Sequence, residues 1–84
     1  MVDIKSIRNN FPQLSDDATH YLDSSATSLT PRGVLGVVEE YYVDYRANVH
    51  RGLFREGVHA TERYEETRKK VADFIGAHNA KEII

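Results

Sequence analysis

Asn48-Val49-His50-Arg51-Gly52 is a short polar stretch that separates two amphipathic segments, each with the residue pattern of a helix. It places an imidazole beside a guanidinium and follows them with a glycine, which turns where a residue with a Cβ would resist. Such a pair suits an anion or a reacting group. The same residues are also typical of an ordinary loop between helices, so the local pattern leaves both interpretations open.

The segment before this stretch is predicted to be a helix that begins at Thr30-Pro31. Thr30 can cap the helix, and Pro31 loses nothing at the first helical position. Apolar residues then recur at spacings of three and four, and the helix is expected to end near Arg46 or Ala47. These residues are Val34, Leu35, Val37, Val38, Tyr41, Tyr42 and Tyr45. The three tyrosines are expected in a core or a subunit interface.

The segment after the stretch is predicted to be a helix from about Gly57 or Val58 to Ile75, with Gly76 in the left-handed position that ends it. Its predicted inner face consists of Ala60, Tyr64, Thr67 or Arg68, Val71, Phe74 and Ile75. Two expected ion pairs four residues apart are Glu65 with Lys69 and Glu66 with Lys70.

The beginning of the chain is predicted to hold one short helix from Ile4, capped by Asp3 and closed by Pro12. Residues 13–19 have the composition of a loop, and residues 19–23 form a β-prone run that could be one strand. Because a lone strand lacks a partner, the predicted fold class is mainly α, with three helices and at most one short strand.

The composition indicates one small domain, a single unit over residues 1–84. A net charge of -2 gives no general attraction to nucleic acid or to an anionic membrane. The chain contains no Cys, no leader and no apolar run long enough for a membrane span, so a cytoplasmic location is expected. His20 and His59 have acidic neighbours but no complete ligand set, so no metal site is expected.

Five motifs follow one another in an order and spacing typical of a known family. They are Phe11-Pro12-Gln13-Leu14, Tyr21-Leu22-Asp23-Ser24-Ser25-Ala26-Thr27-Ser28, Thr30-Pro31, Asn48-Val49-His50-Arg51-Gly52 and Ala60-Thr61-Glu62. In this series the whole chain resembles the N-terminal end of the Suf-type cysteine desulfurases, pyridoxal-phosphate (PLP) enzymes of the class V aminotransferase family. The motif from Tyr21 to Ser28 is typical of class V enzymes. The motif from Asn48 to Gly52 is typical of the desulfurase and selenocysteine lyase branch.

The resemblance implies that the parent protein is a homodimeric α/β enzyme of PLP-dependent fold type I. Such an enzyme holds PLP as a Schiff base on a lysine and takes sulfur from L-cysteine onto a catalytic cysteine as a persulfide. It releases alanine and passes the sulfur to an acceptor protein for iron-sulfur cluster assembly. The residues that the resemblance places near substrate or cofactor are Ser25, Ala26, Thr27, His50, Arg51 and Gly52. The first three would face the substrate side of the cofactor, the next two would line the entrance, and the glycine would permit the turn.

The chain departs from the family pattern at three places: Ser25 replaces an alanine, Phe54 replaces a second histidine, and Arg55-Glu56-Gly57 replaces Thr-Leu-Ser. In the family, the Schiff-base lysine, the stacking histidine, the phosphate loop and the nucleophilic cysteine all lie beyond the position of Ile84. The lysines of this chain match none of these segments. We therefore expect a chain truncated after Ile84, with no catalytic residue of its own and no PLP binding on its own.

A protein of another class fits the same pattern, namely a small helical module derived from this family that acts by binding a protein partner. In both interpretations the broad apolar helix faces have only each other to cover. Self-association into a homo-oligomer is therefore expected.

Overall fold

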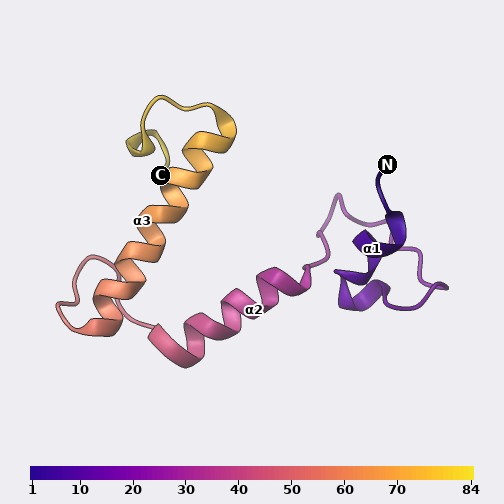
Figure 1. Cartoon of the computed structure of the whole chain (residues 1–84), viewed down its shortest axis with the longest axis horizontal. Helices are drawn as coiled ribbons and strands as arrows, with labels where there is room; N and C mark the ends of the chain where they lie inside the picture. The colour runs from indigo at the N-terminus through magenta and orange to yellow at the C-terminus, as the bar shows by residue number, and fades with distance from the viewer. The chain divides into compact units, whose positions relative to one another are not determined.

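The computed structural model describes residues 1–84 and consists of helices joined by turns, with no β-strand (Figure 1). The predicted mainly helical fold is thereby confirmed. The chain divides into two compact units, an N-terminal unit, Met1–Glu39, and a C-terminal unit, Glu40–Ile84. None of the helices has the length and apolar character needed to cross a membrane.

The N-terminal unit begins with α1, Ile4–Asn9, which is capped as predicted because the Asp3 side chain accepts a hydrogen bond from the Lys5 N–H. A 3₁₀ turn, η1, Pro12–Leu14, follows it. The Arg8 guanidinium donates to the carbonyl oxygens of Asp16 (3.1 Å) and Thr19 (3.0 Å). One arginine of the short helix therefore holds the following loop in place.

The β-prone run at residues 19–23 is not a strand. The structure has no other strand, so the backbone groups of this run have no ladder to join. Instead, the Tyr21 hydroxyl lies within hydrogen-bond distance of the Thr27 carbonyl oxygen and 3.3 Å from that of Asp23. The side chain thus pins a turn that replaces the expected strand pairing.

Helix α2, Arg32–Glu40, passes directly into a π-helical turn, η2, Tyr41–Tyr45. The helical segment therefore ends within two residues of its predicted end, but its last turn is wider than an α-helix. At its start, the N–H groups of Val34 and Leu35 donate to the Pro31 carbonyl oxygen (3.1 and 3.2 Å). Pro31 therefore takes the capping position that was predicted for Thr30.

Helix α3, Arg55–Ile75, begins two or three residues before the predicted start and ends where predicted. Gly76 has a φ of 72°, which confirms the left-handed stop. A final 3₁₀ turn, η3, Ala80–Glu82, is capped by the Asn79 side chain, which accepts from the Lys81 N–H at 2.9 Å.

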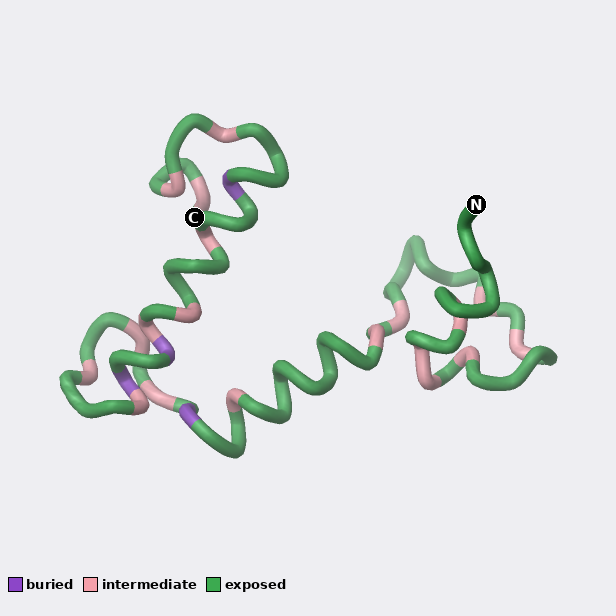
Figure 2. The backbone as a smooth tube through the Cα atoms, viewed as in Figure 1, coloured by how far each residue is buried: buried purple, intermediate pink, exposed green.

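Burial is sparse and lies in the C-terminal unit, where Tyr45, Ala60 and Ala72 are the only buried hydrophobic residues (Figure 2). The predicted inner position of Ala60 is confirmed, whereas Phe74 is 91% exposed. The inner face of α3 is instead defined by the segments that fold back on it, η2 and η3. On α2, the four aliphatic side chains are half exposed: Val34, Leu35, Val37 and Val38.

Candidate functional site

The polar stretch between η2 and α3 is a turn centred on His50, the only non-glycine residue with a positive φ, 66°. This backbone conformation is costly for a residue with a Cβ. The His50 N–H donates to the Thr61 hydroxyl at 2.9 Å, and that hydroxyl donates to the Gly57 carbonyl oxygen at 2.8 Å. The first turns of α3 therefore hold the strained residue.

The imidazole of His50 lies against the outer surface of α3. Its Nε2 atom is 2.6 Å from Glu65 Oε1, and its ring meets the Tyr64 ring edge to face, with 5.5 Å between the centroids. The His50 side chain remains 51% exposed. The ring is thus oriented on one edge while it stays accessible to solvent.

Glu65 is held in turn by Arg68, whose Nη1 atom lies 3.4 and 3.3 Å from the two carboxylate oxygens. The hydrogen bond to His50, followed by the charge of Arg68, holds the pKa of the Glu65 carboxyl below its usual value. Arg68 Nε also donates to the Ile83 carbonyl oxygen at 3.0 Å. The predicted pair of Glu66 with Lys70 forms at 2.9 Å, whereas Glu65 pairs with His50 and Arg68 instead of Lys69.

Arg51 and Gly52 complete the turn. The Arg51 guanidinium is exposed and makes no hydrogen bond or ion pair within the chain. The left-handed residue of this turn is His50, and Gly52, which was predicted to permit the turn, does not have a positive φ. What Gly52 supplies is close approach, since a Cβ added to it would lie 3.0 Å from the Gly57 Cα.

The other predicted site residues, Ser25, Ala26 and Thr27, lie in the N-terminal unit at an exposed turn. The Asp23 carbonyl oxygen accepts from the N–H groups of Ala26 (3.0 Å) and Thr27 (3.1 Å). Thr27 also lines a cavity of about 340 Å³. The structure therefore groups the predicted residues as two turns, one in each unit.

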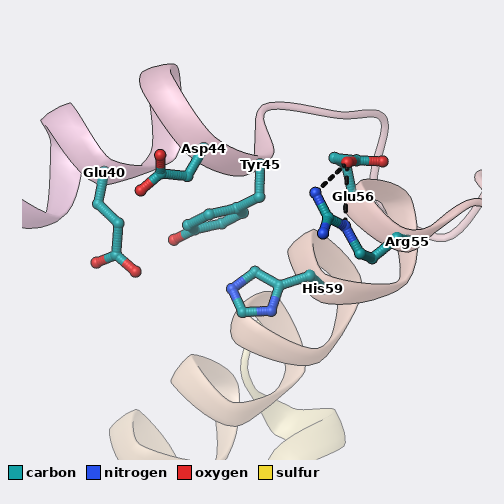
Figure 3. Close-up of a pocket in the computed structure, with 6 residues that line it drawn as sticks. All are labelled: Glu40, Asp44, Tyr45, Arg55, Glu56 and His59. Carbon is teal, nitrogen blue, oxygen red and sulfur yellow. Dashed lines mark hydrogen bonds and ion pairs between the residues drawn. The ribbon is translucent and has the colours of Figure 1, made fainter.

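A second feature of the C-terminal unit is a cavity of about 280 Å³ (Figure 3). Tyr45 and His59 form one wall, with their rings edge to face and 4.4 Å between centroids. The remaining lining residues are charged: Glu40, Asp44, Arg55 and Glu56. Hydrogen bonds from its own backbone N–H and from the Arg55 guanidinium lower the pKa of Glu56, so this pair stays ionised.

The side chains of this part of the protein do not form a site for a metal ion or for PLP. No three potential metal ligands lie together. PLP requires an amine for its aldehyde and donors for its phosphate. One cavity of the C-terminal unit and two of the N-terminal unit have no lysine in their lining, and the one in the C-terminal unit is dominated by carboxylates. The residues present therefore do not fit the cofactor by themselves.

The sequence also matches known proteins. Residues 20–84 match the family described as Aminotransferase class-V, and the chain belongs to this family. Among curated relatives, a probable cysteine desulfurase of Pyrococcus abyssi is 60% identical over 57 residues, covering 68% of this chain and 14% of the relative. A probable cysteine desulfurase of Streptomyces coelicolor is 46% identical over 90 residues, covering all of this chain and 21% of the relative.

A solved structure gives the same result for the fold. The apo structure of a cysteine desulfurase from Thermococcus onnurineus NA1 matches 92% of this chain and 19% of that chain, with 49% identity and a TM-score of 0.81. The relatives that match the whole chain are thus about five times as long. The helical fold is therefore that of the corresponding part of a cysteine desulfurase.

Two residues that hold the site were missed by sequence reasoning, Thr61 and Glu65. Both face the His50 turn, and they are four residues apart on α3, a spacing that places side chains on one helix face. That spacing was a usable signal, but Glu65 was assigned to an equally spaced lysine. The sequence alone does not show that a loop returns to this face.

Proposed function

We propose that the chain is the N-terminal part of a PLP-dependent cysteine desulfurase and is not catalytically competent alone. The support is the family membership and the match to relatives named as cysteine desulfurases over the whole chain. The complete enzyme would be a homodimeric α/β protein of fold type I in the cytoplasm. It would act in Suf-type sulfur transfer for iron-sulfur clusters.

In that enzyme the reaction would take sulfur from L-cysteine onto a cysteine as a persulfide, release alanine, and pass the sulfur to an acceptor protein. PLP, when bound, supplies the electron sink for this chemistry. Because the residues present do not fit the cofactor by themselves, this chain would supply none of the groups that hold PLP. Its proposed contribution is the rim of the active site.

The observation that carries this proposal is the paired state of His50 and the unpaired state of Arg51. His50 and Arg51 are neighbours in one turn, yet only His50 is fixed by hydrogen bonds to α3. A guanidinium without an internal partner can bind a carboxylate through two parallel hydrogen bonds. L-cysteine carries such a carboxylate, so Arg51 is proposed to bind it and His50 to serve proton transfer beside it.

The other turn, Ser25-Ala26-Thr27, is proposed to face the substrate side of the cofactor. Its side chains are small and exposed, and its backbone is fixed by the Asp23 carbonyl oxygen and the Tyr21 hydroxyl. Small residues allow a bulky planar group to approach the backbone. Ser25, which replaces an alanine of the family pattern, would add a hydroxyl to that surface.

The test is a chimera in which this chain replaces the matching segment of the Thermococcus onnurineus desulfurase. We expect the chimera to bind PLP and release alanine from L-cysteine, and Arg51→Ala to lower kcat/KM at unchanged PLP absorbance. The matched control is Arg55→Ala, because Arg55 is also exposed and pairs only with its neighbour Glu56. A folded, PLP-loaded chimera without alanine release, or equal activity of the two arginine variants, would contradict the proposal.

The alternative of a small helical binding module is supported by one observation, the half-exposed aliphatic side chains of α2. Under that interpretation the chain does not have to form the rim of an active site. A chimera that releases no alanine, combined with tight binding of the isolated chain to an intact desulfurase, would favour it over the enzyme segment.

A further inference from the structure

Three residues of α3 form a continuous chain of polar contacts under the His50 turn. Thr61, Glu65 and Arg68 follow one another at spacings of four and three, so they lie along one helix face. The Thr61 hydroxyl accepts a hydrogen bond from the His50 N–H, and the Glu65 carboxylate is hydrogen-bonded to the His50 ring. Arg68 contacts Glu65 and also donates to the Ile83 carbonyl oxygen. The turn is therefore tied to α3 and, through Arg68, to Ile83 in the segment that follows the helix.

The contacts hold both the backbone and the side chain of one residue. A left-handed conformation at a non-glycine residue persists only where the surroundings over-determine it, and such residues gather at functional sites. Here the Thr61 hydroxyl fixes the backbone N–H of His50, and the Glu65 carboxylate fixes its ring. Neither contact involves Arg51, which the same turn presents to solvent.

The contact with Glu65 also determines which ring nitrogen is free. An ionised carboxylate only accepts hydrogen bonds, so the proton of a neutral His50 ring must lie on Nε2. The lowered pKa of Glu65 supports the ionised form. Nδ1 then carries the free lone pair, and it has no partner within the chain.

We propose that Glu65 and Thr61 are positioning residues, which hold His50 in the Nε2–H form with Nδ1 available as the basic nitrogen of the active-site rim. The role as a rim rests on the function proposed above, but the contacts themselves do not. Arg68 strengthens the arrangement because its positive charge lies beside the ionised Glu65 carboxylate and its Nη1 atom forms an ion pair with it. In this arrangement a proton leaves or reaches the substrate through Nδ1 while Nε2 stays bonded to Glu65.

Glu66 provides a matched control. It is the neighbouring glutamate of the same helix, its pKa is also lowered, chiefly by its hydrogen bond to Lys70, and it forms an ion pair of 2.9 Å. It pairs with Lys70 and forms no hydrogen bond or ion pair with the His50 turn. Removing it changes the charge of α3 by the same amount as removing Glu65.

The first arm of the experiment is nitrogen-15 NMR of the histidine rings in the 84-residue chain, at a pH at which the His50 ring is neutral. In the wild type and in Glu66→Ala we expect a proton resolved on His50 Nε2 and an unprotonated Nδ1. Glu65→Ala should lose the resolved proton, and Glu65→Gln should keep it because an amide oxygen still accepts a hydrogen bond. A wild-type ring with rapidly exchanging protons, whether or not α3 is helical, would overturn the proposal.

The second arm measures alanine release by the chimera described above. Glu65→Ala should lower kcat/KM about tenfold, as removal of a residue that orients a reacting ligand does, whereas Glu65→Gln should retain most activity and Glu66→Ala all of it. Equal activity of Glu65→Ala and Glu66→Ala in an active chimera would refute the positioning role and leave the proposed function intact. An inactive chimera would refute the proposed function, while the NMR arm would still decide whether Glu65 fixes the ring.

Discussion

Gly52 and Gly57 approach each other backbone to backbone, so closely that a Cβ added to Gly57 would lie 2.8 Å from the Gly52 Cα. The other atoms that this Cβ would meet, at 3.1 Å, are also Gly52 backbone atoms and cannot rotate away. This approach seats the His50 turn on the first turn of α3.

The first prediction follows from this approach. Gly57→Ala should destabilise the C-terminal unit by about 1–3 kcal/mol, because the loop backbone must shift. Gly36→Ala is the control, since a Cβ there meets nothing within 4 Å and should stabilise α2 by up to about 1 kcal/mol. Circular dichroism at 222 nm against urea measures both, and an equal response of the two variants would contradict the prediction.

The second prediction concerns the strain at His50. His50→Ala and His50→Gly both lose the contact with Glu65, but only alanine keeps the cost of a Cβ at a φ of 66°. The glycine variant should therefore be more stable than the alanine variant by about 1 kcal/mol. The comparison uses urea unfolding of the two variants, and a more stable alanine variant would show that the left-handed conformation is absent in solution.

The third prediction is a dependence on pH. Since the pKa of Glu65 is lowered in the folded chain, its contribution to stability is fully present above the ordinary glutamate value of about 4.3. The contribution is lost as the pH falls through the lowered value. Other carboxyl groups titrate in the same range, so the measured quantity is the difference from Glu65→Gln, which should shrink below pH of about 4. A difference that is constant with pH would contradict this account.

The fourth prediction tests the loop of the N-terminal unit. The Asp16 carboxylate accepts from the N–H groups of Ala18 (2.9 Å) and Thr19 (2.7 Å) and from the Thr19 hydroxyl (2.9 Å). These bonds, chiefly those from Thr19, lower the pKa of Asp16. Asp16→Ala should release the loop, seen as faster amide hydrogen exchange at Thr19, whereas Asp17→Ala should leave it unchanged. Equal exchange in both variants would show that Asp16 does not hold the loop.

The fifth prediction addresses the expected self-association. Val38→Asp places a charge among the aliphatic side chains of α2 and should lower the mass measured by light scattering at high concentration. Val43→Asp is the control, because Val43 is 74% exposed and lies outside that helix. A monomeric wild-type chain would contradict the prediction.

Much of the fold could be predicted because helix signals are local. The three- and four-residue spacing located α3 to within three residues, and Asp3 and Gly76 cap helices as expected. The exposed position of Phe74 could not be predicted, because burial depends on which segment returns to a helix face. Periodicity identifies an apolar face but not its partner.

The candidate site was predicted in part for the same reason. The histidine-arginine pair stood out as a motif and Gly52 was predicted to permit the turn, but the pattern assigned the left-handed conformation to no residue. The structure assigns it to His50, since Thr61 and Glu65 stabilise the less favourable residue. Contacts eleven and fifteen residues apart in the sequence are not visible in the spacing of either segment alone.

The sparse core has a calorimetric consequence. Tyr45, Ala60 and Ala72 are the only buried hydrophobic residues, so unfolding exposes little apolar surface that was not already in water. A fully packed chain of this length would unfold with a heat capacity change of about 1.0–1.3 kcal/mol/K, and this chain should fall well below that range. In the proposed enzyme, the α2 face would become buried only when it docks onto the remaining fold. The heat capacity change of that docking step would therefore be large and negative. Folding and assembly of this sequence would then be a single thermodynamic event.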